Sequence, residues 1–146
     1  MGEKEYLMIK LGSHSEADFY LEHSKVIKEN GYVDMALLTR KRPAISSYQD
    51  KIYIKESVKN GNRLFSATVS GEVEQGDKYP EYYGSFLEEE GANLNSANGR
   101  KPIWIRLTNL QIEDVEAVNN NFKTKSGKEI KAVLKASVPF FAMLRK

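Results

Sequence analysis

The segment KIYIKESVKNGNRLFSATVSGEV, residues 51–73, contains two runs rich in apolar and β-branched residues on either side of an Asn-Gly pair. Residues 51–55 and 63–73 have the length and composition of strands. Asn60-Gly61 favours a tight turn between them, because both residues readily adopt the positive φ that such a turn requires. This segment therefore predicts an antiparallel hairpin, around which a larger sheet can form.

The chain before the hairpin predicts a strand, a helix and a second strand. Residues 6–11 form a compact apolar run, typical of a strand inside a fold. A helix is expected next, because Ser13 and Glu16 have the spacing of a capping box and apolar residues then recur at about 3.6-residue intervals. Gly31 supplies a left-handed end to this helix. Residues 32–39 are expected to resume as a strand.

The chain after the hairpin is less regular. Residues 74–100 are acidic and rich in Gly and Asn, which predicts a long excursion with one short helix. Residues 102–110 alternate like a strand, and residues 113–118 are typical of one or two helical turns. Residues 128–136 fit either a strand or a helix, and their β-branched residues favour the strand. The tail, residues 138–144, is expected to be a terminal turn that closes the core.

The whole chain, residues 1–146, is expected to form a single domain. Its 40% hydrophobic and 29% charged residues are typical of an ordered protein of this size. Five to seven mostly antiparallel strands with one early inserted helix predict an α+β fold built on a small curved β-barrel. Cysteine is absent, and no apolar run is long enough for a signal peptide or a membrane span. A soluble cytoplasmic protein is therefore expected.

Charge is segregated along the chain although the net charge is only +2. Residues 39–71 hold seven basic and two acidic residues, and residues 100–146 hold ten and four. Residues 72–99 hold one basic and seven acidic residues, which makes this segment a candidate surface for a protein partner. If the two basic segments meet in space, they form a positive face that attracts phosphate. Ordinary solvated strand edges and loops are the alternative.

Residues for catalysis or metal binding are sparse. Only His14 and His23 could supply an imidazole, and on a helix their nine-residue gap points them about 180° apart. This favours exposed positions on the helix over a metal site. Phosphate-loop, dinucleotide and zinc-protease motifs are absent from the sequence, so no metal, cofactor or catalytic set is expected. Lys10, Ser13 and Glu72 could hydrolyse an amide if they converged, with the lysine pKa lowered by burial.

Aromatic residues interleaved with basic ones are a more useful signal. Tyr32 and Trp104 have arginines near them in the sequence. A nucleobase stacks on an aromatic ring for about 1–3 kcal/mol, while neighbouring Lys or Arg side chains hold the phosphate backbone. Core packing is the alternative for each ring. Trp104 in particular faces either the core or a pocket, because an alternating strand directs it away from its two neighbours.

A family resemblance rests on the order of these segments. Residues 6–10, followed by Gly12 and Ser13, resemble the first strand of EVE and YTH domains in the PUA-like superfamily, where an aromatic-apolar strand ends in lysine and a small polar residue. Gln49 stands where these domains usually have glycine, and Tyr32 is the nearest substitute for the tryptophan that they carry after the early helix. The other similar segments, in the same order, are residues 48–54, 64–73, 101–107 and 137–141.

The resemblance implies a small barrel that binds DNA or RNA carrying a modified base, which is flipped into an aromatic pocket. Methylation is the expected modification. The residues implied for the base are Lys10, Gly12, Ser13, Tyr32 and Trp104, and those implied for the phosphates are Arg40, Arg42 and Arg106. The related ASCH domains imply an alternative, an amidohydrolase that uses Lys10 on a modified nucleoside. A protein-interaction factor that acts through residues 72–99 is the third alternative.

Overall fold

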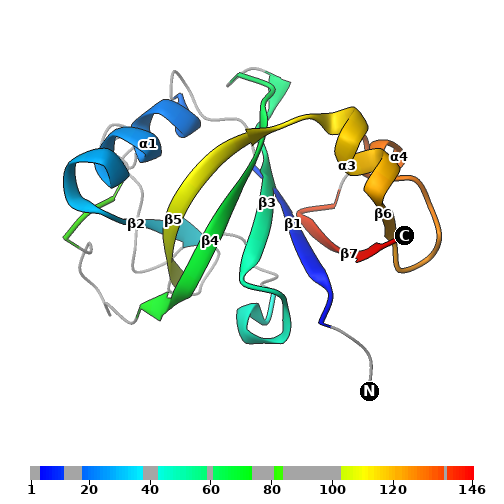
Figure 1. Ribbon diagram of the computed structural model, residues 1–146, viewed down its shortest axis with the longest axis horizontal. Helices are drawn as coiled ribbons and strands as arrows, with labels where there is room; N and C mark the ends of the chain where they lie inside the picture. Colours follow the sequence, from blue (N-terminus) through cyan, green and yellow to red (C-terminus); the bar gives the residue numbers. More distant parts are fainter. Residues whose placement is uncertain are drawn as a thin grey trace.

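A computed structural model describes residues 4–11, 18–37, 43–58, 61–73, 81–83, 103–136 and 138–146 (Figure 1). Its strands are β1 (Tyr6–Lys10), β2 (Val33–Leu37), β3 (Lys51–Lys55), β4 (Leu64–Val73), β5 (Ile103–Glu113), β6 (Phe122–Thr124) and β7 (Phe140–Arg145). The α-helices in these ranges are α1 (Phe19–Asn30), α3 (Val115–Asn121) and α4 (Ile130–Leu134), and a short 3₁₀ helix, η1, covers Ile45–Ser47. The chain is therefore a small mixed α/β protein rich in strands.

The seven strands form one sheet in the order β2-β5-β4-β3-β1-β7-β6. The predicted hairpin is confirmed as the antiparallel pair β3 and β4, and every other pair except the parallel β1 and β3 is also antiparallel. Irregular register in β4 near Ser66 and Val69 accompanies the bend of β5 seen in Figure 1. Among the described residues no pairing joins β2 to β6, so the sheet is open and its closure into a barrel is not confirmed.

The first helix begins later than the sequence predicts. Asp18 is its N-cap, and the Asp18 carboxylate accepts a hydrogen bond from the Leu21 amide at 3.0 Å. Ser13, the expected cap, lies outside the described residues. The predicted end is confirmed, because Gly31 has a φ of 91° and its amide bonds to the Ile27 carbonyl. None of the helices in the described parts of the chain combines the length and the apolar character that crossing a membrane requires.

The C-terminal quarter corrects two expectations. The segment favoured as a strand contains the helix α4, in which Ile130 is buried and packs with Leu134, one turn later, into the same apolar cluster. This packing outweighs the strand preference of its β-branched residues. The expected terminal turn is instead the strand β7, which lies between β1 and β6. Its partner β1 is at the other end of the chain, so no local pattern announces the pairing.

Both faces of the central strands are buried. Leu7 and Ile9 of β1 belong to a core cluster that includes Phe19 of α1, whereas Met8 belongs to a second cluster with Ile130 of α4. Figure 1 shows α1 at one end of the sheet and α3 and α4 at the other. Burial on both faces explains why residues 6–11 read as a continuous apolar run.

Candidate nucleic-acid interface

Two lysines lie side by side where the central parallel strands end. Lys10 closes β1, Lys55 closes β3, and they are partners in the register. The Lys10 ammonium group donates to the Ala136 carbonyl, and that of Lys55 donates to the Glu56 carbonyl at 2.8 Å and to Asn62 Oδ1 at 2.5 Å. Burial lowers the pKa of both lysines, and for Lys55 the attraction of Glu56 raises the pKa while the charge of Lys10 lowers it further. Within the described residues neither ammonium group forms an ion pair.

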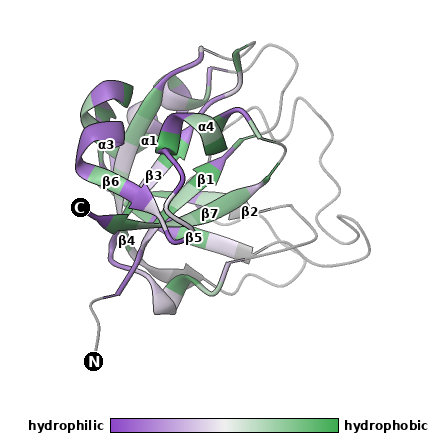
Figure 2. Cartoon of the chain, turned by 90° about the vertical axis from the view of Figure 1, so that its right-hand side faces the viewer, coloured by the Kyte–Doolittle hydropathy of each residue, from purple (hydrophilic) through white to green (hydrophobic). Residues whose placement is uncertain are grey.

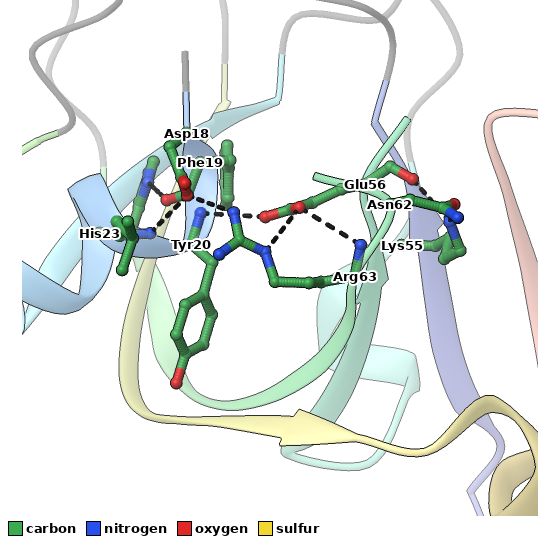
Figure 3. Close-up of polar contacts among 9 residues, drawn as sticks. Asp18, Phe19, Tyr20, His23, Lys55, Glu56, Asn62 and Arg63 are labelled. Atoms are coloured by element: carbon green, nitrogen blue, oxygen red, sulfur yellow. Dashed lines mark hydrogen bonds and ion pairs between the residues drawn. The ribbon is translucent and has the colours of Figure 1, made fainter. Parts of the chain in front are cut away.

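The neighbouring arginine is already neutralised (Figure 3). Glu56 is only 1% exposed, and its carboxylate accepts from Arg63 Nε at 3.0 Å and from the Tyr20 amide at 3.0 Å. Arg63 also forms an ion pair with Asp18, the N-cap of α1. The amino end of α1 and the Arg63 charge are thus satisfied by the protein's own carboxylates. Lys10 and Lys55 are the cations at this end of the strands that no carboxylate among the described residues neutralises.

A larger group of cations covers the corner formed by β6, α4 and β7. Residues 122–146 contain seven basic residues and one acidic residue, Glu129. Among the described residues, Lys125 forms an ion pair with Glu5 at 2.9 Å and Lys131 forms one with Glu116. Figure 2 shows α3 and β6 beside the C-terminus on this side of the molecule. We call this corner the C-terminal basic surface, and its members are Lys123, Lys125, Lys128, Lys131, Lys135, Arg145 and Lys146.

The lysine pair adjoins the C-terminal basic surface through the backbone of residues 136 and 139. Lys10 reaches the Ala136 carbonyl, next to Lys135, and the Lys10 amide donates to the Pro139 carbonyl at 2.9 Å. Lys55, beside Lys10, comes from the first basic segment of the chain, and Lys135 comes from the second. Lys10 therefore lies between a lysine of the first basic segment and the backbone beside a lysine of the second.

The two expected stacking residues are not brought together. Trp104 is 1% exposed and packs in the core near Tyr83, with ring centres 6.3 Å apart. Of the two positions expected for Trp104, core or pocket, the structure therefore shows the core. Tyr32 lies four residues before Ala36, the residue of β2 that pairs with Trp104. Along an extended chain this separation places the Tyr32 Cα atom about 13 Å from that of Ala36. In this conformation the two rings do not line one hollow.

Arg106, an expected phosphate contact, is partly exposed and is paired with a buried carboxylate. Its guanidinium group forms two bonds to the Asp34 carboxylate, Nε–Oδ1 at 2.9 Å and Nη2–Oδ2 at 3.1 Å, and Asp34 is 0% exposed. The guanidinium also lies 3.9 Å from the centre of the Tyr32 ring. The hydrogen bond to Asp34 raises the Arg106 pKa. An acidic residue inside the apolar strand β2 was the sequence signal for this buried partner.

The other expected site residues differ in what can be said of them. Gly12, Ser13, Arg40 and Arg42 lie outside the described residues, as do the side chain of Glu72 and most of residues 72–99, so these stay predictions.

The expectation for His23 is wrong. The ring is buried rather than on the surface, stacks on Phe19 with centres 3.8 Å apart, and has Nδ1 3.0 Å from the Phe19 carbonyl oxygen. His14 lies outside the described residues. Within the described chain no group of three His, Asp or Glu residues is placed to hold a metal.

Sequence reasoning missed most of the residues of the candidate interface. Lys55 was not among the expected site residues, and the cations of the C-terminal basic surface were counted only in segment charges. The available signal was the run of lysines at intervals of two to four residues from Lys123 to Lys135. Comparisons with protein-family models, with curated proteins and with solved structures gave no match to this chain. Its function must therefore be argued from this geometry.

Proposed function

We propose that this protein binds nucleic acid through the C-terminal basic surface and the adjoining Lys10–Lys55 pair. The observation that carries the proposal is the density of uncompensated positive charge on one corner. Lys123, Lys128, Lys135 and Lys146 are exposed and have no ion-pair partner among the described residues. A phosphate backbone neutralises such a surface and releases its own counterions, which favours binding without any base contact.

The strand ends supply a position for base recognition. The Lys10 ammonium group is partly buried and has no carboxylate partner among the described residues, so an acceptor atom on a base edge or a phosphate oxygen would satisfy it. This supports the finer proposal taken from the resemblance, a PUA-like domain in which a modified base is flipped towards Lys10, Gly12 and Ser13. Flipping costs a few kcal/mol, which contacts to the extruded base must offset.

A panel of labelled single-stranded DNA and RNA oligonucleotides tests this proposal. Each carries one methylated base, and its affinity is compared with that of the unmodified strand by fluorescence anisotropy. We expect salt-sensitive binding of all strands and about tenfold tighter binding of one modified strand, which corresponds to about 1.4 kcal/mol. Lys10→Ala should remove that preference, whereas Lys25→Ala on the exposed face of α1 should keep it. Absence of binding even at low salt would refute nucleic-acid binding as the function.

One observation favours a second function, hydrolysis of an acylated nucleoside. Burial lowers the pKa of Lys10 from its ordinary value of 10.5, and a lysine with a lowered pKa is a better general base near neutral pH. Release of the acyl group from an N-acylated nucleoside, followed by chromatography, tests this function. Turnover that is lost in Lys10→Ala and kept in Lys25→Ala would support the enzyme, and no turnover by the unaltered protein would exclude it for that substrate.

A further inference from the structure

A hollow of about 330 Å³ opens between β6, α4 and β7, inside the C-terminal basic surface. This volume lies within the range of small-ligand sites. Its apolar lining is Val133, Ala136, Val138, Phe141 and Ala142. Neither the function proposed above nor the sequence pattern uses this hollow.

The rim of the hollow is polar and positively charged. Thr124, Lys125, Ser126 and Lys128 complete its lining, and no acidic residue belongs to it among the described residues. Thr124 Oγ1 lies 3.1 Å from Ser126 Oγ and donates to the Lys128 carbonyl at 3.1 Å. The Lys128 ammonium group is exposed and has no ion pair within the described chain, whereas Lys125 is shared with Glu5. The rim thus offers hydroxyl groups and one uncompensated charge.

Apolar side chains are open to solvent below this rim. Val138 is 36% exposed, and Phe141 is partly exposed at the edge of the second core cluster. A flat ring laid against them removes apolar surface from water and stacks on the phenyl group. A phosphate joined to that ring would meet the charge of Lys128. The hollow therefore complements a planar group on an anionic chain.

We infer that this hollow receives one nucleobase of the strand that lies on the C-terminal basic surface. The inference rests on the proposed function and gives it a pocket other than the Tyr32 and Trp104 pair. Ala136 connects the hollow to the strand ends, because it lines the hollow and its carbonyl accepts a hydrogen bond from Lys10. A base in the hollow thus lies against the wall that Lys10 supports.

A strand with abasic sites distinguishes the contribution of the bases to the affinity from that of the phosphates. Affinities are measured by fluorescence anisotropy for a single-stranded oligonucleotide and for the same strand with abasic sites throughout. The Ala142→Leu variant adds bulk at a residue that lines the hollow, and Ala117→Leu makes the same change at an exposed position on α3. We expect the unaltered protein and Ala117→Leu to bind the base-bearing strand five- to tenfold more tightly. Ala142→Leu should bind both strands alike, at the abasic affinity.

Equal preference for the base-bearing strand in Ala142→Leu and in the unaltered protein would overturn the inference, even with nucleic-acid binding intact. Circular dichroism checks the fold, and Ala136→Leu adds bulk at another residue of the lining if Ala142→Leu unfolds. If no strand binds at all, the proposed function fails, and the hollow is tested with adenosine monophosphate. Shifts in the methyl NMR signals of Val133 and Val138 would then support a base site, and unchanged signals would refute it.

Discussion

The salt dependence of binding is the most direct consequence of an uncompensated basic surface. Four of its lysines, 123, 128, 135 and 146, are exposed without an ion pair among the described residues. If each contacts one phosphate of a single strand, the logarithm of the affinity falls with the logarithm of salt concentration with a slope of about −2.8. Between about 50 and 200 mM salt, the affinity then falls about 50-fold.

Removing two of these charges should change the slope rather than only the affinity. The double variant Lys128→Gln and Lys135→Gln leaves two of the four contacts, so we expect a slope of about −1.4 and a loss of about sevenfold over the same salt range. The matched control is Lys25→Gln with Lys28→Gln, which removes the same net charge from exposed positions on α1. Its slope should stay near −2.8, because α1 supplies no phosphate contact in this proposal.

Fluorescence anisotropy with a labelled single strand of about 12 nucleotides, titrated at four salt concentrations, gives both slopes. A control slope that falls as far as that of the test variant would show that only the net charge of the protein matters. A test variant with an unchanged slope would show that the strand binds elsewhere. Either result refutes the C-terminal basic surface as the interface.

Two other predictions concern the charges of Lys10 and Arg106. Burial lowers the Lys10 pKa below 10.5, so the affinity for an oligonucleotide should begin to fall at a lower pH than it would with an ordinary lysine. The Lys10→Arg variant should move this fall to higher pH. Identical pH profiles for the two proteins would contradict a charged contact by Lys10. Arg106→Met leaves the Asp34 carboxylate buried without a counter-charge and should lower the free energy of unfolding in urea by about 3 kcal/mol, and adding Asp34→Asn should recover part of it. A loss of less than about 1 kcal/mol, or no recovery, would count against this ion pair as a stabilising contact.

Local sequence patterns were sufficient for the elements that depend on neighbours in the chain. The hairpin of β3 and β4 follows from its strand composition, and Gly31 marks the end of α1 through its left-handed backbone. The two C-terminal elements depend instead on distant partners. Ile130 is buried in a cluster with Met8, and Met143 of β7 pairs with Tyr6. Such contacts are invisible in a window of ten residues, so β-branched composition misled the assignment of α4.

The candidate site shows the same division for a different reason. Lys10 was singled out because it ends a recognisable strand, whereas its neighbours in the proposed site, Lys55 and Ala136, are brought there by the sheet. Trp104 and Arg106 have the residue types expected of a nucleic-acid site, yet the core and Asp34 account for their contacts. Residue type alone does not distinguish a stacking ring from a core ring, or a phosphate-binding arginine from a buried ion pair. Burial and partner identity decide both cases.

The position of the lysine pair follows from the two-sided burial of the sheet. β1 and β3 are covered on both faces, so their interior residues must be apolar and only their ends can carry charge. Because the two strands are parallel, their charged ends fall at the same edge, and Lys10 and Lys55 become neighbours despite the 44 positions between them. β7 lies on the other side of β1, and the chain segment that leads into it, from Ala136 to Pro139, brings the C-terminal basic surface against that edge. Thus the strand order that buries the core also brings together charges from two distant basic segments. A register shift of β1 against β3 would separate the lysine pair while leaving the composition of the surface unchanged.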